Sequence, residues 1–145
     1  MPYHTKVISS QEASYWTFRD YVEGTSTPIE DWYQRLSEDA KFLFQATLKN
    51  IRKTENPIQW GGFRFLKGKL RAEQIWELKF FADKRQYRIL GIFGEARKQV
   101  VLLMGCYHKQ GNYTPTDALD TALKRAKALK ERRGGLRERK IRTDF

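Results

Sequence analysis

Three polar side chains stand where an apolar segment of the sequence ends. Residues 100–106 read VVLLMGC, and Tyr107, His108 and Lys109 follow directly. A phenol, an imidazole and an ammonium can exchange hydrogen bonds or protons with a substrate, and the imidazole does so near neutral pH. Two interpretations are open: these are ordinary polar residues at a strand end, or they belong to a functional site.

The apolar segment is the last of three predicted strands that would position these side chains. The strands cover residues 74–81, 86–93 and 99–107, and the short polar linkers ADKR and GEARK separate them. Linkers of this length favour hairpins between antiparallel strands. An earlier segment, residues 15–22, alternates between apolar and polar residues, which predicts a half-buried strand whose apolar face is interrupted by Asp20.

A helical region is predicted between the first strand and the other three. It begins at Thr27, a capping residue that Pro28 follows, and Glu30 is spaced to complete a capping box. Ser37 can cap a second helix and so divide the region in two. The region ends before Pro57, because proline disfavours helix in the residue before it.

The last helix is predicted over residues 114–132, with Thr114 as its cap and Pro115 in its first turn. Its apolar stripe consists of Leu119, Ala122, Leu123, Ala126 and Leu129. The glycine-punctuated segment 60–72 is predicted to be a basic loop.

These elements predict an α+β fold: a small, mostly antiparallel sheet of about four strands with an N-terminal helical hairpin and a C-terminal helix. We expect the domain to cover residues 15–133. Residues 1–14 would form an N-terminal extension, and residues 134–145 would form a loose basic tail.

The composition narrows the class of protein. The chain of 145 residues has one cysteine, Cys106, and two histidines, His4 and His108, so no metal site or cofactor is expected. It has no apolar stretch of the roughly 18 residues that would suggest a membrane span, and no apolar leader near its first residue. We therefore expect a cytoplasmic protein.

The charge of the chain predicts a polyanionic partner. The net charge is +11, and residues 124–145 carry +7 of it. Nucleic acid is the first candidate for such a partner, and an anionic membrane surface or an acidic protein is the second.

Three segments of the sequence resemble one known family. IWELKF at 75–80, YRILGIF at 87–93 and the segment 101–127, which begins VLLMGCYHKQ, are similar to RelE/HigB-type toxins of type II toxin–antitoxin systems, in particular their phage-derived branch. The segment from Trp16 to Phe44 also fits the opening strand and helical hairpin of that family. No single motif is specific, and the resemblance rests on their order and spacing over residues 15–132.

The resemblance implies a metal-independent, ribosome-dependent endoribonuclease that cuts mRNA and thereby inhibits translation. It also implies a cognate antitoxin, in the HigB branch usually a helix-turn-helix protein, and an RelE-like fold. Two alternatives remain open at this point. One is a non-catalytic member of the same fold that binds nucleic acid or protein, and the other is a phage-encoded structural or morphogenetic protein.

The resemblance also assigns candidate site residues. Cleavage of RNA by its own 2′-hydroxyl needs a base, an acid and cations around the phosphate. Arg88 matches a family arginine that contacts the scissile phosphate, and Lys109 matches a basic strand-end position. Family members differ at the position of His108, which is a candidate to move a proton because an imidazole titrates near neutral pH. The candidates for RNA binding are Lys79, Arg64, Lys67, Lys69, Arg71 and Tyr107.

Each of these assignments has a simpler alternative, in which the side chain is a solvated residue of a strand or loop. Glu77 is expected to be a structural hydrogen-bond or ion-pair partner. The aromatic residues Trp60, Phe63, Phe65 and Trp76 have the chemistry to stack on bases, but core packing is the favoured interpretation.

Overall fold

Three consecutive antiparallel strands form the centre of the sheet in the computed structural model, which describes residues 14–142. They are β3 (Trp76–Ala82), β4 (Arg85–Phe93) and β5 (Gln99–Lys109). The prediction of these strands and of their hairpin connections is confirmed. Their register places Lys79 opposite Arg88.

The prediction of a mostly antiparallel sheet of about four strands is wrong in size and in pairing. The sheet has seven strands in the order β2-β3-β4-β5-β1-β7, and β6 pairs with β5 outside that path. The strand β1 (Thr17–Val22) runs parallel to β5, so the sheet is mixed. The α+β class itself is confirmed.

The three missed strands are short: β2 (Phe63–Phe65), β6 (Asn112–Thr114) and β7 (Gly135–Glu138). Segments of three or four residues are too short to show the alternation that identifies a strand in a sequence.

The helical region before the sheet is divided as predicted. It forms α2 (Pro28–Gln34) and α3 (Glu38–Arg52), and the Ser37 hydroxyl accepts a hydrogen bond from the Ala40 amide at 3.0 Å. The capping box at the start of α2 is wrong, because the Thr27 side chain makes no capping bond. A 3₁₀ helix, η1 (Pro57–Gln59), follows.

Two further predictions about local structure need correction. The segment 60–72 contains β2 and a short helix, α4 (Lys69–Ala72), rather than only a loop. The C-terminal helix, α5 (Ala118–Lys130), begins later than predicted, because Thr114 belongs to β6 and pairs with Tyr107.

The sheet separates two hydrophobic cores. The side that α2 and α3 cover, here called the α2/α3 face, carries Leu78, Ile89 and Leu102, which pack with Phe44 and Leu48 of α3. Because opposite residues of paired strands point to the same side, the register assigns each strand residue to one face.

The other side, here called the α5 face, carries Leu90, Val101 and Leu103. The residues of α5 that are buried against it are Ala118, Ala122, Ala126 and Ala128. The predicted stripe residues Leu119, Leu123 and Leu129 are only partly buried at the edge of this core. The small alanine side chains let the helix lie close to the sheet.

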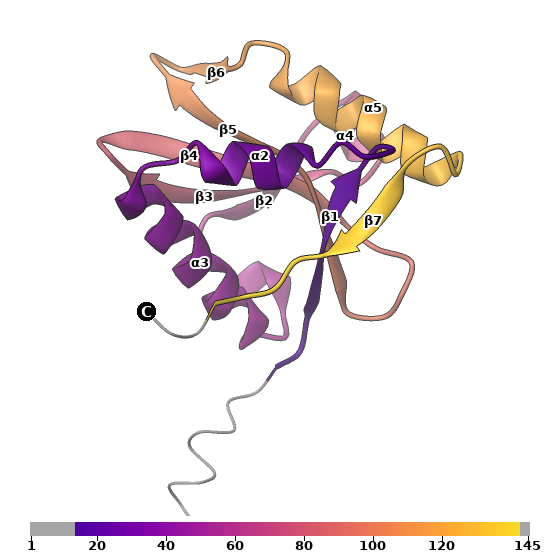
Figure 1. Ribbon diagram of the computed structural model, residues 1–145, viewed down its shortest axis with the longest axis horizontal. Helices are drawn as coiled ribbons and strands as arrows, with labels where there is room; N and C mark the ends of the chain where they lie inside the picture. Colours follow the sequence, from indigo (N-terminus) through magenta and orange to yellow (C-terminus); the bar gives the residue numbers. More distant parts are fainter. Residues whose placement is uncertain (1–13, 143–145) are drawn as a thin grey trace, which may run out of the picture.

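The segment after α5 is part of the fold (Figure 1). The strand β7 pairs antiparallel with β1, and the Arg139 side chain is buried, so the expectation of a loose segment is wrong for residues 135–139. The boundary at residue 133 stays a prediction. Residues 1–13 of the predicted extension and residues 143–145 of the predicted tail lie outside the described part of the chain.

Candidate functional site

Polar and charged side chains gather on the α5 face of strands β2 to β6. The register aligns Arg64 with Glu77, Lys79 with Arg88, and Gln86 with His108 across neighbouring strands. His108 is in turn opposite Tyr113 of β6. We call this group the polar cluster: Arg64, Glu77, Lys79, Gln86, Arg88, His108 and Tyr113.

Glu77 is at the centre of the polar cluster and is fully buried. One carboxylate oxygen, Oε1, accepts a hydrogen bond from the Tyr113 hydroxyl at 2.8 Å. The other, Oε2, accepts one from Arg88 Nη1 and one from Arg64 Nε, the latter at 3.3 Å. The expectation that Glu77 is a structural ion-pair partner is therefore confirmed.

These contacts decide the charge of Glu77. Burial alone would raise the pKa of its carboxyl, because a low-dielectric environment disfavours the ionised form. The hydrogen bond from Tyr113 and the positive charges of Arg88 and Arg64 outweigh burial and hold the pKa below its usual value. Glu77 is thus a carboxylate at neutral pH.

Arg88 is buried, so the alternative that it is a surface arginine is wrong. In addition to Glu77, its guanidinium donates from Nη2 to the Gln86 side chain at 2.8 Å. Its Nε is buried and has no hydrogen-bond partner among residues 14–142. The arginine predicted to contact phosphate is therefore paired with the ionised carboxylate of Glu77, and its Nε donor makes no hydrogen bond with the described residues.

His108 is half-buried beside Tyr113. The two ring centroids are 4.2 Å apart and the rings are nearly perpendicular, at 85°. The Nε2 atom is buried without a hydrogen-bond partner in the described part of the chain.

The surroundings of His108 favour its neutral form. Burial and the charges of Arg88, Arg64 and Lys79 lower the pKa of the imidazole, and the opposing effect of Glu77 is smaller. The residue therefore has the correct protonation state at pH 7 to accept a proton.

The structure does not bring Lys109 together with Arg88 and His108. Consecutive strand residues point to opposite faces, so Tyr107 and Lys109 lie on the other side of β5 from His108. Tyr107 packs edge-on against Tyr87 with ring centroids 5.9 Å apart. Lys109 is exposed at the end of β5.

The other predicted RNA-binding residues divide into two groups. Lys79 and Arg64 belong to the polar cluster and are exposed, with the Arg64 side chain 56% accessible. Lys67, Lys69 and Arg71 are exposed outside it. The Arg71 guanidinium lies 4.5 Å from the centre of the Phe65 ring.

The aromatic residues that were candidates for base stacking mostly fill the core. Trp60 and Trp76 are buried, Phe63 is partly buried, and all three pack against one another. Only Phe65 of these four is exposed, at 36%. The preference for core packing is confirmed for the two tryptophans.

Three residues of this region, Gln86, Tyr113 and Cys106, were not recognised from the sequence as neighbours of the candidate site. Tyr113 lies beyond the end of the predicted strand, and the two-residue turn at Gln110-Gly111 is the signal that would have placed it opposite His108. Cys106 is buried beneath Arg88, and burial raises the pKa of its thiol to about 12. That thiol is therefore not a candidate nucleophile.

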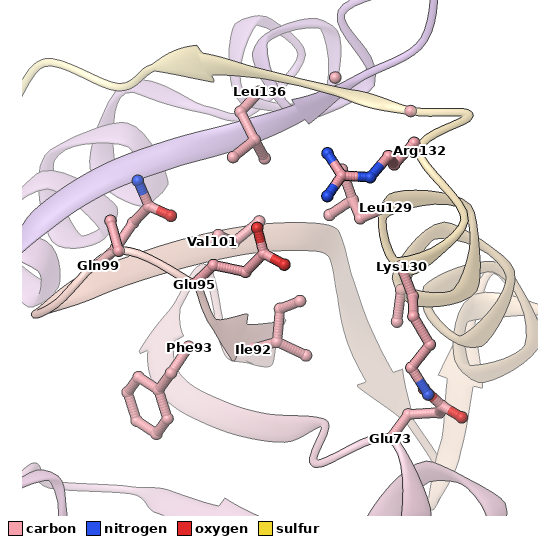
Figure 2. Close-up of a pocket in the computed structure, with 15 residues that line it drawn as sticks. Glu73, Ile92, Phe93, Glu95, Gln99, Val101, Leu129, Lys130, Arg132 and Leu136 are labelled. Atoms are coloured by element: carbon pink, nitrogen blue, oxygen red, sulfur yellow. The ribbon is translucent and has the colours of Figure 1, made fainter.

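A separate groove of about 650 Å³ opens between α5, β7 and the loop that joins β4 to β5. In Figure 2, Leu136 of β7 and Leu129 of α5 face Val101 across it. At its border Lys130 forms a salt bridge with Glu73 at 3.0 Å. The groove contains none of the predicted site residues. The polar cluster remains the candidate for chemistry.

Residues 14–142 contain no group of three or more histidine, cysteine or acidic side chains that could hold a metal ion. In the same part of the chain, every helix is too short or too polar to cross a membrane.

Comparison with known proteins identifies one family. The model of the family described as Phage derived protein Gp49-like (DUF891) matches residues 31–127, about two thirds of the chain. The matched segment contains every residue of the polar cluster but neither β1 nor β7. Searches of curated proteins and of solved structures found no match. The chain belongs to the Gp49-like family of phage-derived proteins, which is part of the RelE/toxin-like superfamily and is associated with toxin–antitoxin systems.

Proposed function

We propose that this protein is the toxin of a toxin–antitoxin system and cuts mRNA on the ribosome, as RelE/HigB-type toxins do. The observation that carries the proposal is the polar cluster, in which a neutral imidazole lies among three cationic side chains on one face of the sheet. Family membership supports the toxin role in general terms.

The proposed reaction is attack by the RNA 2′-hydroxyl on the adjacent phosphorus. The 2′-oxygen forms a bond to phosphorus while the bond to the 5′-oxygen breaks, which leaves a 2′,3′-cyclic phosphate and a 5′-hydroxyl. Neutral His108 accepts the 2′-hydroxyl proton. Lys79 and Arg64 neutralise the phosphate charge, and the buried guanidinium of Arg88 adds positive charge on the same face. Solvent or a ribosomal group then protonates the leaving 5′-oxygen.

This chemistry requires a base, an acid and cations, so no metal ion or cofactor is needed for it. Lys109 was assigned to the phosphate from the resemblance, and its position on the other side of β5 gives that role less support than Lys79 has. We keep both lysines as candidates, and the variants described below separate them.

The decisive experiment is single-turnover cleavage of mRNA on programmed ribosomes. Loss of a proton-transfer group typically lowers a rate about 100-fold or more, so His108→Gln should cleave at about 1% of the parent rate. His4→Gln is the matched control because it removes the other histidine. A His108→Gln variant that cleaves as fast as the parent would remove His108 from the mechanism.

We further propose a cognate antitoxin as the partner, in the HigB branch a helix-turn-helix protein. The net charge of +11 favours an acidic partner that covers basic surface. Co-expression with the neighbouring gene should give a stable complex and relieve growth arrest. If the chain arrests growth alone and no neighbouring product binds it, the antitoxin part of the proposal is wrong.

One observation favours a second function, a binding protein of the same fold without nuclease activity. The guanidinium of Arg88 is already engaged by Glu77 and Gln86, which leaves fewer donors for a phosphate. A non-catalytic member would bind ribosomes or RNA in a salt-dependent manner and leave the RNA intact. Ribosome sedimentation together with mRNA integrity separates the two functions.

A further inference from the structure

We infer that Tyr113 is the positioning residue of the polar cluster: its hydroxyl holds the Glu77–Arg88 pair in place, and its ring fixes the imidazole of His108. The consequence for cleavage rests on the proposed function. The two structural contacts do not depend on it.

The hydroxyl contact completes the coordination of Glu77. Arg88 and Arg64 both approach Oε2, and Tyr113 is the donor to Oε1 among the described residues. Without that donor, a fully buried carboxylate oxygen would have no hydrogen bond, which is unfavourable for a charged group. The carboxylate would then be free to rotate, and Arg88 would follow it. The Tyr113 hydroxyl therefore sets the orientation of the arginine.

The ring contact acts on His108 independently of the hydroxyl. The edge-to-face arrangement at 4.2 Å shields one side of the imidazole from water. Protonation would place a new N–H or its charge beside Arg88, Arg64 and Lys79, in a region where Nε2 already lacks an acceptor. The ring thus keeps the histidine neutral by excluding the water that would solvate a cation.

The chain has a local device that places Tyr113 there. Gln110 and Gly111 both have positive φ, at 53° and 81°, and form a two-residue turn between β5 and β6. This turn aligns Tyr113 with His108, so a single hairpin brings the aromatic ring to the imidazole and the hydroxyl to Glu77. A residue on β6 therefore connects two groups that lie on β3 and β5.

The experiment separates the two contacts with two variants. Tyr113→Phe removes the hydroxyl and keeps the ring, whereas Tyr113→Leu removes both. The histidine titration is followed by proton NMR, which is simple to assign because the chain has two histidines and His4→Gln leaves one. Tyr87→Phe is the matched control, since its hydroxyl also contacts a carboxylate, that of Asp83, but on the α2/α3 face.

In the parent protein we expect His108 to titrate below about 6.5, the usual imidazole pKa. Tyr113→Phe should keep the ring-current shift of the His108 protons but cleave about tenfold more slowly, as expected for loss of a hydrogen bond to a charged group. Tyr113→Leu should lose the ring-current shift, and the pKa of His108 should rise toward that of a solvated imidazole. Tyr87→Phe should change neither measurement.

Each part of the inference can be overturned. A folded Tyr113→Leu variant with an unchanged His108 titration removes the ring contact, and parental cleavage by Tyr113→Phe removes the hydroxyl contact. If Tyr113→Leu does not fold, the parent protein and Tyr113→Phe still test the ring contact: both should show a ring-current shift of the His108 protons, and its absence contradicts the arrangement. If the parent shows the expected titration but no cleavage, the proposed function fails and the positioning role of Tyr113 stands.

Discussion

Two buried arginine–carboxylate pairs occupy opposite faces of the same sheet. On the α2/α3 face, the Nε and Nη2 atoms of Arg139 both donate to Asp20 Oδ2, at 3.0 Å and 2.6 Å. Nη2 also lies 2.8 Å from a carboxylate oxygen of Glu30. On the α5 face, Arg88 binds Glu77. The side chains of Arg139 and Arg88 are almost equally buried, with 7% and 6% of their surface accessible to solvent.

The surroundings of the two pairs differ. Arg139 lies over the rings of Tyr33 and Phe44, at 5.4 Å and 5.8 Å from their centres, so aromatic side chains cover it. Arg88 has a histidine, a tyrosine and two exposed cations as neighbours on its face. Burial and pairing alone therefore do not mark a functional site. Exposed cations, Arg137 and Lys140, also lie beside the Arg139 pair. The imidazole of His108 beside the Arg88 pair is what distinguishes the polar cluster.

The largest expected effect comes from breaking the Arg139 pair. Arg139→Ala leaves Asp20 buried without its counter-charge, which should lower the free energy of unfolding by about 3–5 kcal/mol. Urea denaturation measures this, with Arg137→Ala as a control that should change stability by less than about 0.5 kcal/mol, because Arg137 is an exposed residue of β7, the strand that ends just before Arg139. Equal stability of the two variants would contradict a structural role for the Arg139 pair.

Arg88→Ala should have a smaller effect on stability, about 2–3 kcal/mol, because Arg64 and Tyr113 still donate to Glu77. The same variant should reduce cleavage at least 100-fold under the proposed function. Thermal denaturation identifies a temperature at which the variant is folded, and the cleavage assay is run at that temperature. A loss of stability as large as that of Arg139→Ala would show that the two pairs are equivalent.

The pH dependence of stability offers a test at intermediate scale. The pKa of His108 is lowered in the folded protein, so the unfolded chain binds more protons as the pH falls through about 6.5. His108 therefore reduces stability on acidification from pH 7.5 to 5.5, and His108→Gln should make this pH dependence shallower. At the other pair, Arg139→Ala should raise the pKa of the buried Asp20 carboxyl further, because the charge of Arg139 opposes the effect of burial there. Parallel stability profiles for the parent and His108→Gln would refute the assignment of His108.

The smallest effects on stability are expected for the exposed lysines. Lys79→Ala and Lys109→Ala should each change the free energy of unfolding by less than about 0.5 kcal/mol. In the ribosome assay we expect only Lys79→Ala to slow cleavage, because Lys79 shares the face of Arg88 and His108. The opposite result, with only Lys109→Ala affected, would favour the assignment made from the resemblance.

The parts of the fold that were predicted from the sequence are those with a local signal. The apolar and alternating segments at 74–81, 86–93 and 99–107 predicted β3, β4 and β5 to within two residues at each end, and Ser37 predicted the division between α2 and α3. Asp20 was recognised as an interruption of an apolar face. Its partner was not, because Arg139 is 119 residues away and nothing local connects the two.

The candidate site shows the same limit. Alternation along β5 was sufficient to place His108 and Lys109 on opposite faces, yet the resemblance kept them together. The burial of Arg88 and its pairing with Glu77 depend on the register between β3 and β4, in which Lys79 is opposite Arg88. The role of Tyr113 depends on a three-residue strand that carries no periodic signal.

The pairing of β7 with β1 also has a consequence for the order of folding. Contacts between residues far apart in the sequence form slowly, because closing a long loop is entropically unfavourable. The contact between Asp20 and Arg139 closes such a loop, since the two residues are 119 positions apart. The meander of β3, β4 and β5 needs only short loops and should form early. Every residue of the polar cluster lies between Arg64 and Tyr113, in or beside that meander. The site should therefore assemble before the first and last strands join the sheet, and amide exchange should show β1 and β7 opening most readily.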